Sequence, residues 1–273
     1  EEIRVRAGQC LSVRVRGREW RLEVRYTVEE IRQILSYLAN YSLYAYEREI
    51  RQGYLTLPGG HRLGLVGRAV LEEDRITSLM EISALNLRLA HEKKGCADSV
   101  ISCLWEQDNL CDTLVVSPPG GGKTTLLRDC IRQISDGTKE HRGRTVGVVD
   151  ERSEIAGCCR GVPENDVGMR TDVLDGCPKT LGMRMLLRSM APEVLAVDEI
   201  GSEEDVREIQ YAANCGCTVF ATVHGDSLDA LQNQPNLRKL LETGVFQRLL
   251  FLEGWDAPGR IRQVTDHRGT VLC

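Results

Sequence analysis

The 273-residue chain has few aromatic residues and no long apolar run. Phe, Trp and Tyr make up only 5% of it, which argues against the base-stacking platforms of single-strand-binding proteins. No stretch approaches the roughly 20 apolar residues that cross a bilayer, and no signal peptide opens the chain. We therefore expect a cytoplasmic protein that contacts a membrane only through partner proteins or through a segment preceding Glu1.

Closely paired cysteines of the metal-binding kind are also missing. The eleven cysteines include no Cys-x-x-Cys pair, and Cys215 and Cys217 are too close together for a standard zinc knuckle. Their odd number and scattered positions favour free thiols in a reducing cytosol. The chain also contains no internal repeat and no low-complexity segment.

What is present is an ordinary globular composition with an uneven charge. The chain is 42% hydrophobic and 27% charged, and it is long enough for two domains. Residues 1–95 carry 16 Lys and Arg against 13 Asp and Glu, whereas residues 96–273 carry 19 against 27. The N-terminal arginines alternate with apolar residues, which favours strands with one solvated face over a surface for nucleic acid or acidic lipid. These arginines are Arg4, Arg6, Arg14, Arg16, Arg18, Arg21 and Arg25.

Residues 1–95 predict a small α+β domain. Apolar residues recur at helical spacing over 28–40, and Thr27 and Glu30 have the spacing of a capping box at the start of that helix. Residues 91–95 indicate a linker. Alternating or apolar stretches predict strands over 1–25, 54–57, 62–68 and 84–90.

From residue 96 onward, short apolar strands alternate with helical stretches. This order predicts a mostly parallel sheet covered on both faces, an α/β domain over residues 96–273. A helix expected over 181–190 carries Arg184 and Arg188 on one face, either solvated or directed at a neighbouring subunit, and Arg170 is equally ambiguous. The strands are expected over 112–116, 145–149, 194–198, 217–223 and 248–252.

The segment between the first of these strands and the next helical stretch reads SPPGGGKTT. Its glycines permit a tight turn that directs backbone N–H groups at an anion, next to a helix N-terminus. Lys123 can contact β- and γ-phosphates, the hydroxyl of Thr124 is placed to bind Mg²⁺, and Thr125 supports the helix start. The sequence thus predicts a phosphate-binding loop for ATP and Mg²⁺ rather than a ligand-free turn. The loop consists of Ser117, Pro118, Pro119, Gly120, Gly121, Gly122, Lys123, Thr124 and Thr125.

This loop departs from the usual pattern at one position. The pattern has glycine five residues before its Gly-Lys pair, and here that residue is Ser117. The departure leaves the fold prediction unchanged and the nucleotide affinity open.

An apolar strand that ends in two acids follows about 75 residues after the loop. Val194–Val197 precede Asp198 and Glu199, and such a strand delivers one carboxylate to magnesium and a second toward the attacking water. We assign Asp198 to Mg²⁺, through water, and Glu199 to the activation of water. At this spacing the pattern favours that role over a plain strand terminus.

Two further strand ends carry polar groups. Residues 150–154 (DERSE) form either an acidic cluster beside a metal-triphosphate, with Arg152 offsetting the charge, or a polar cap on a following helix. His224 is either structural or placed to sense the γ-phosphate, because parallel strand ends meet at one crevice.

These motifs, taken in order, resemble the secretion-ATPase superfamily, the hexameric RecA-like motors of type II and type IV secretion and of pilus assembly. Segments 57–62 and 85–88 are similar to the first-domain signature of that superfamily. A closer resemblance, to the stage III sporulation AA family, is carried by residues 41–45, 53–56, 59–64 and 149–157.

The resemblance implies a RecA-like P-loop ATPase domain behind a smaller α+β N-terminal domain, assembled as a hexameric ring. It implies a mother-cell ATPase at the cytosolic face of a channel between mother cell and forespore, with membrane-embedded channel proteins as partners. By the family pattern, Glu151 and Glu154 lie near the nucleotide, His224 belongs to a His box, and Arg62 and Arg88 contact phosphate. The short Asp198-Glu199 pair leaves open whether Glu199, Glu151 or Glu154 activates water.

Two other functions fit parts of the sequence. One is a nucleic-acid-dependent ATPase on the same fold, suggested by the arginine-rich residues 4–25, although we expect no nucleic-acid partner. The other is a nucleotide-gated scaffold with little turnover. The sequence does not distinguish ATP from GTP.

Overall fold

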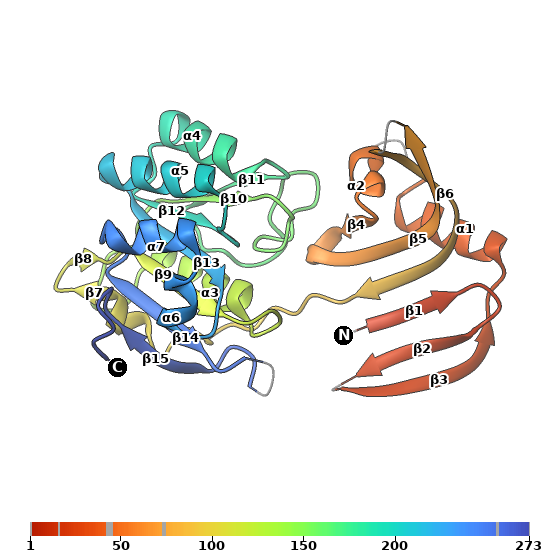
Figure 1. Ribbon diagram of the computed structural model, residues 1–273, viewed down its shortest axis with the longest axis horizontal. Helices are drawn as coiled ribbons and strands as arrows, with labels where there is room; N and C mark the ends of the chain where they lie inside the picture. Colours follow the sequence, from red (N-terminus) through yellow and green to blue (C-terminus); the bar gives the residue numbers. More distant parts are fainter. Residues whose placement is uncertain (1, 16, 42–45, 73–74, 255–256, 273) are drawn as a thin grey trace. The chain divides into compact units, whose positions relative to one another are not determined.

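The computed structural model describes residues 2–15, 17–41, 46–72, 75–254 and 257–272. The chain divides into two compact units, Glu1–His91 and Glu92–Cys273 (Figure 1). The division falls at His91 rather than at Gly95, where the sequence predicts the boundary. Arg16 and residues 42–45 of the sporulation-family resemblance lie outside the described residues.

The N-terminal unit is a six-stranded antiparallel sheet with two helices. Its strand order is β3-β2-β1-β6-β5-β4. Three strands lie within residues 2–15 and 17–25, and on their polar face Arg4 and Arg14 pair with Glu2 at 2.5 and 3.7 Å. The elements are β1 (Glu2–Arg6), β2 (Cys10–Val15), β3 (Arg18–Arg25), α1 (Val28–Leu38), α2 (Glu47–Arg51), β4 (Tyr54–Leu57), the 3₁₀ turn η2 (Pro58–Gly60), β5 (His61–Glu72) and β6 (Arg75–Arg88).

Helix α1 begins at the predicted capping box. The hydroxyl of Thr27 accepts a hydrogen bond from the N–H of Glu30 at 3.2 Å, and the Glu30 carboxylate accepts one from the N–H of Thr27 at 2.7 Å. The helix packs against β6, and its apolar side buries Ile31 and Leu35. They join the core of this unit with Val5, Leu55, Leu57, Leu63, Leu65 and Leu85.

The C-terminal unit contains a seven-stranded sheet in the order β11-β10-β12-β13-β9-β14-β15. All neighbouring pairs are parallel except β14 with β15. Its elements are η3 (Ile101–Leu104), β7 (Trp105–Glu106), β8 (Asn109–Leu110), β9 (Thr113–Ser117), α3 (Lys123–Asp136), β10 (Val146–Asp150), β11 (Thr171–Asp175), α4 (Lys179–Ser189), β12 (Val194–Val197), α5 (Glu203–Asn214), β13 (Thr218–His224), α6 (Leu228–Gln232), α7 (Pro235–Glu242), β14 (Arg248–Leu252) and β15 (Ile261–Thr265).

Helices cover both faces of this sheet, as predicted. Leu127 and Ile131 of α3 pack on one face against the side chains of Val115 and Phe220. Helices α4, α5 and α7 cover the other face, and together the two apolar cores enclose the sheet (Figure 1). Five predicted strands are confirmed to within one residue as β9, β10, β12, β13 and β14; β11 and β15, at the two edges, were not predicted.

The segment between the two units is attached on both sides. The N–H of Ala90 donates to Nδ1 of His61 at 3.0 Å within the N-terminal unit. Glu92 accepts from the N–H of Asp166 at 2.7 Å, and Lys94 pairs with the Asp166 carboxylate at 2.6 Å, both within the C-terminal unit. Most of the predicted linker, residues 91–95, is therefore bound to the second unit.

Two expectations about cellular context can be compared with the structure. Within the described residues, no helix has both the length and the apolar character needed to cross a membrane. Cysteines such as Cys96, Cys130 and Cys158 are free thiols, but Cys103 is disulfide-bonded. The expectation of free thiols is wrong at Cys103, because spacing along the chain does not reveal which cysteines the fold brings together.

Candidate nucleotide-binding and hydrolysis site

The predicted phosphate-binding loop lies at the carboxyl end of the central strand β9. Strand β9 ends at the buried Ser117, the loop passes through Pro118 and Pro119, and α3 begins at Lys123. Gly120 and Gly122 have φ angles of 74° and 92°, in the left-handed region that glycine adopts without strain. The sequence therefore places its glycines where the turn needs them.

The first turn of α3 presents backbone donors to this loop. Its first hydrogen bond within the helix runs from the N–H of Leu126 to the carbonyl of Gly122 at 3.0 Å. The preceding N–H groups have no partner inside the helix and can donate to a phosphate. They belong to Lys123, Thr124 and Thr125.

The loop is also held by the connection between β14 and β15, which the sequence does not indicate. The N–H of Gly259 donates to the carbonyl of Gly121 at 2.8 Å. A Cβ atom on Gly122 would lie 2.5 Å from the Gly259 nitrogen, so only glycine fits there.

Ser117, the departure from the usual motif, points its hydroxyl into this turn. Its Oγ donates to the carbonyl of Pro118 at 3.0 Å. A Cβ atom on Gly121 would lie only 1.9 Å from that Oγ. The serine side chain thus fills the space that a side chain at Gly121 would need.

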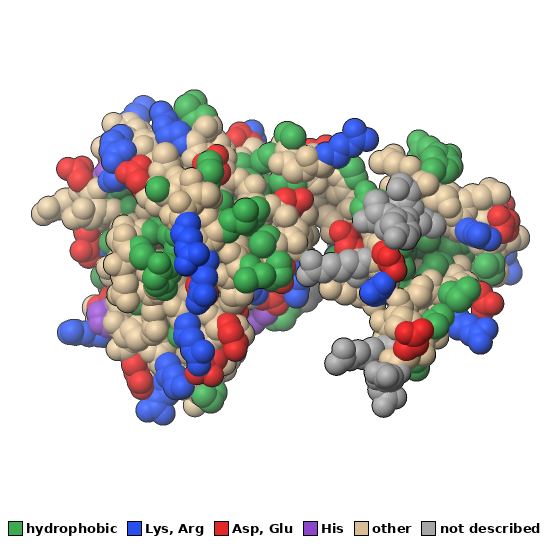
Figure 2. Space-filling view, turned by 90° about the horizontal axis from the view of Figure 1, so that it is seen from above, with side chains coloured by type: hydrophobic (Ala, Val, Ile, Leu, Met, Phe, Trp, Pro, Cys, Tyr) green, Lys and Arg blue, Asp and Glu red, His purple; other side chains and the backbone are tan. Residues whose placement is uncertain are grey.

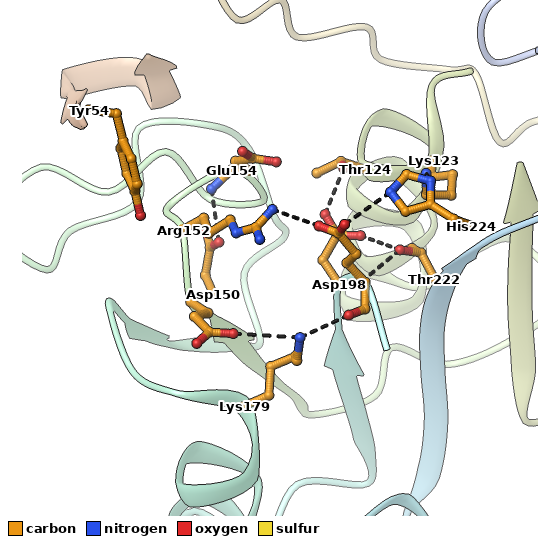
Figure 3. Close-up of polar contacts among 12 residues, drawn as sticks. Tyr54, Lys123, Thr124, Asp150, Arg152, Glu154, Lys179, Asp198, Thr222 and His224 are labelled. Atoms are coloured by element: carbon orange, nitrogen blue, oxygen red, sulfur yellow. Dashed lines mark hydrogen bonds and ion pairs between the residues drawn. The ribbon is translucent and has the colours of Figure 1, made fainter. Parts of the chain in front are cut away.

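The two predicted magnesium residues lie next to each other (Figure 3). The hydroxyl of Thr124 donates to one carboxylate oxygen of Asp198 at 2.7 Å, and the hydroxyl of Thr222 donates to the other. A hydroxyl and a carboxylate beside a phosphate loop fit Mg²⁺, which binds oxygen ligands and takes part of its shell from substrate phosphates. Within the described residues, no three His, Cys, Asp or Glu side chains form a metal site by themselves.

Lys123 contacts His224 (Figure 3), which in turn contacts Glu199. Burial lowers the pKa of Lys123, against the opposing charges of Asp198, Glu199 and Glu154. Its Nζ lies 2.9 Å from Nδ1 of His224, and Nε2 of that ring lies 3.0 Å from Oε1 of Glu199. Because an ammonium group can only donate, Nδ1 accepts and Nε2 carries the proton that Glu199 accepts.

Glu199 is fixed by several contacts. Its backbone has a φ angle of 53°, unusual for a residue other than glycine, and its N–H donates to the hydroxyl of Thr222 at 2.9 Å. Oε2 of its carboxylate accepts a hydrogen bond from Arg152 at 2.7 Å. The side chain is therefore held near Lys123, to which His224 links it.

The acidic segment after β10 forms a turn. One oxygen of the buried Asp150 accepts from the N–H of Glu154 at 2.9 Å, and the other accepts from Ile155 and Ala156 at 3.0 and 2.8 Å. Arg128 of α3 donates to the carbonyls of Glu154, at 2.6 Å, and Ile155. Burial raises the pKa of Asp150 to about 6, although the three N–H donors oppose it.

This turn excludes one of the two interpretations of the acidic segment, and the other stays a prediction. No helix follows β10 in the described stretch 75–254 before α4, so the polar-cap interpretation is wrong, because Asp150 closes a tight turn instead. Glu151 pairs with Lys179 at 3.5 Å, and Lys179 also donates to the carbonyl of Glu199 at 2.8 Å. Glu151, Arg152 and Glu154 line one small pocket with Asp198 and Glu199.

Two further arginines of this unit have structural partners, and two lie in the other unit. Arg170 donates to the carbonyl of Ser135 at 2.9 Å, and Arg184 forms a two-pronged pair with Glu208 at 2.5 and 2.6 Å. Arg62 and Arg88 are register partners on β5 and β6 of the N-terminal unit, with Arg62 stacked 4.1 Å from the centre of the Tyr54 ring. Their contact with phosphate stays a prediction.

Three residues of the site were not predicted as such. Lys179 begins α4, Thr222 lies on β13 and Arg128 lies in the second turn of α3. Only Thr222 had a signal, since it lies in a predicted strand two residues before His224. Lys179 and Arg128 act through backbone carbonyls of distant loops, which no local pattern reveals.

The chain was compared with known proteins. It matches the family model described as "Sporulation stage III, protein AA" over residues 1–272. It is 43% identical over 272 residues to the stage III sporulation protein AA of Bacillus subtilis (strain 168), covering 100% of this chain and 88% of that protein.

Solved structures with low sequence identity share the fold. The pilus retraction motor PilT with bound ADP has a TM-score of 0.62 at 18% identity, over 92% of this chain and 73% of that one. The ATPase DotB of Legionella pneumophila has a TM-score of 0.59 at 17% identity, over 92% and 71%. These similarities confirm the predicted RecA-like P-loop fold with a smaller α+β N-terminal part. The family match over nearly the whole sequence shows that the chain belongs to the stage III sporulation protein AA family.

Proposed function

We propose that this protein is a Mg²⁺-dependent ATP hydrolase that acts as a motor. The observation that carries the proposal is the continuous set of contacts from Lys123 through His224 to Glu199, beside the Thr124–Asp198 pair. It supports a site in which Lys123 binds phosphate, Thr124 and Asp198 bind magnesium, and Glu199 acts as the base. The similarity to an ATPase and to a pilus retraction motor supports the same conclusion.

The residues of the site have separate roles in the proposed reaction. Lys123 and the first N–H groups of α3 bind the β- and γ-phosphates. Thr124 and Asp198 hold Mg²⁺, which neutralises phosphate charge. A water molecule attacks the γ-phosphorus, its proton passes to Glu199, and ADP leaves as the bond to the γ-phosphate breaks. His224 orients Glu199 through its Nε2–H.

Among the three candidate glutamates, Glu199 is favoured as the base. Its carboxylate contacts His224, which contacts Lys123, whereas Glu151 pairs with Lys179. Glu154 carries a charge near Lys123, and its backbone is fixed in the turn closed by Asp150. We assign Glu151 and Glu154 to the electrostatics of the site, with Arg152 and Lys179 as their balancing cations.

At the level of the cell, we propose an energising role for a channel between mother cell and forespore. Family membership supports a role in sporulation, and the motif resemblance to hexameric motors supports a ring. The protein would act in the mother-cell cytoplasm, at the cytosolic face of a membrane complex, with Arg62 and Arg88 contributing to phosphate binding.

Nucleic acid is disfavoured as the activator. Residues 96–273 carry 19 basic against 27 acidic residues, and in Figure 2 the row of Lys and Arg side chains on the C-terminal unit has acidic side chains beside it. A protein that binds phosphate backbones concentrates positive charge on one surface.

The test is the rate of ATP hydrolysis by the wild type and by Glu199→Gln. We expect the variant to lower kcat by about 10²- to 10⁴-fold, because it removes the proton acceptor, with little change in ATP affinity. Glu151→Gln and Glu154→Gln are the matched controls, and their kcat should fall by less than that of Glu199→Gln. Equal, slow rates in wild type and Glu199→Gln with intact ATP binding would instead indicate a nucleotide-gated scaffold. Strong, salt-sensitive stimulation by single-stranded DNA would indicate a nucleic-acid motor.

A further inference from the structure

Both oxygens of the Glu199 carboxylate are already engaged in the structure. Oε2 accepts from Arg152 at 2.7 Å, and Oε1 accepts from His224 at 3.0 Å. A general base must come within hydrogen-bond distance of the water that it deprotonates. In the structure the guanidinium of Arg152 fills one of the hydrogen-bonding directions of Oε2, so it competes with water for that oxygen.

The two partners of Glu199 differ in what they do. His224 continues to Lys123 and so links Glu199 to the phosphate loop. Arg152 comes from the turn after β10, where its neighbour Ser153 has a φ angle of 52° and donates its hydroxyl to Asp175. Arg152 is therefore placed by the turn after β10, whereas His224 lies on β13, so the two partners of Glu199 are held by different parts of the fold.

The pair between Arg152 and Glu199 is weak enough to open. The side chains are 48% and 38% exposed, so water and salt screen their attraction. Pairs of this exposure change an equilibrium by up to about fivefold. The pair can therefore bias Glu199 toward a resting position without preventing catalysis.

We propose that Arg152 is a positioning residue that holds Glu199 away from the attacking water, and that hydrolysis requires its guanidinium to leave. This inference rests on the proposed function and adds a control on the same site. It assigns a restraining role to the one basic residue of the DERSE segment, in place of simple charge balance. Turnover in the isolated protein is then lower than the site itself allows.

The experiment compares kcat and KM for ATP in the wild type, Arg152→Ala and Arg152→Lys. We expect Arg152→Ala to raise kcat by about three- to fivefold with KM changed by less than twofold, and Arg152→Lys to lie in between. The gain should shrink in high salt, because salt already weakens the pair in the wild type. Arg238→Ala, which removes an exposed arginine paired with Glu242 at 2.9 Å on α7, is the matched control and should not change the rate.

A double variant separates this inference from the proposed function. If Arg152 acts through Glu199, Arg152→Ala/Glu199→Gln hydrolyses ATP no faster than Glu199→Gln. The inference is overturned if kcat of Arg152→Ala is equal to or lower than that of the wild type. It is also overturned if the double variant has a higher kcat than Glu199→Gln. Hydrolysis that is absent from both wild type and Arg152→Ala also overturns it. The proposed function has its own test. It fails if the wild type hydrolyses ATP and Glu199→Gln hydrolyses it at the same rate.

Discussion

Ser117 shows how one side chain sets the space inside the phosphate loop. Its buried Oγ lies where a side chain at position 121 would point, and Gly121 itself does not have a positive φ angle. The φ angle therefore does not require glycine at 121; the tightest contact of an added Cβ atom is with Ser117 Oγ at 1.9 Å, followed by backbone atoms of Gly254 and Pro118 at 3.2 Å. Residues 117 and 121 should behave as a coupled pair.

This coupling can be measured in a double-mutant cycle. We expect Gly121→Ala to lower the free energy of unfolding by about 1–3 kcal/mol, because the new methyl group overlaps Ser117 Oγ. Adding Ser117→Gly should recover most of that loss, with a coupling energy of about 1 kcal/mol or more. Urea unfolding of the two single variants and the double variant gives the answer, and additive effects would contradict the steric explanation.

The same serine variant reports on nucleotide affinity. If Ser117→Gly alone binds a fluorescent ATP analogue markedly more tightly than the wild type does, Ser117 lowers the affinity of the loop for nucleotide. Activation by partner proteins would then be the expected mode of action.

At the scale of elements, Glu193 fastens the start of β12 to the segment leading into β10. Its carboxylate contacts Arg142 at 2.6 Å and Arg144 at 2.8 Å, and it accepts from the N–H of Thr145 at 3.1 Å. Burial alone would raise the pKa of Glu193, but the two arginines and the N–H bond lower it to about 2. A carboxyl group with a lowered pKa stabilises the fold above its ordinary pKa of 4.5, and this stabilisation is lost as the pH falls toward 2.

We expect Glu193→Gln to lower the free energy of unfolding by about 1–2 kcal/mol at pH 7. The loss is smaller than the pKa shift alone implies, because a third of the side chain is exposed and solvent screens the pair. The difference in the free energy of unfolding between Glu193→Gln and the wild type should become smaller as the pH falls below 4.5. Urea unfolding at pH 7 and at pH 3.5 measures it. Glu242→Gln, in an exposed pair with Arg238, is the control, and a difference that stays constant with pH would contradict the assignment.

The elements that the sequence predicts well are those with strong local signals. The buried strands β9, β10, β12, β13 and β14 are short apolar runs, and the capping box fixes the start of α1. The edge strands β11 and β15 read TDVLD and IRQVT, so solvent exposure breaks the apolar run on which the prediction depends.

The residues of the site also divide into those with a local sequence signal and those without one. The phosphate loop and Asp198-Glu199 have local patterns, and the geometry brings His224 to them through parallel neighbouring strands. The roles of Lys179 and Arg128 depend on contacts with carbonyl groups 20 or more residues away, as does the packing of Gly259 on the loop. Such contacts follow from the fold and cannot be found in a local pattern.

At the scale of the whole molecule, the proposed motor must assemble around its nucleotide. We expect Glu199→Gln, which should bind ATP without hydrolysing it, to form a ring in the presence of Mg-ATP and to return to smaller species when Mg²⁺ is chelated. Sedimentation velocity at one fixed protein concentration measures the change. A species that stays monomeric at saturating Mg-ATP would argue that assembly needs partner proteins, and Lys123→Ala provides the control that lacks the phosphate-binding cation.

The short attachment between the two units has a mechanical consequence. Ala90 is held through its backbone N–H in one unit, and Glu92 is held through its side-chain carboxylate in the other. Only His91 lies between these two residues, and one residue spans at most about 3.6 Å. If the protein works as the proposed motor, this short connection limits how far the chain can stretch between the two units.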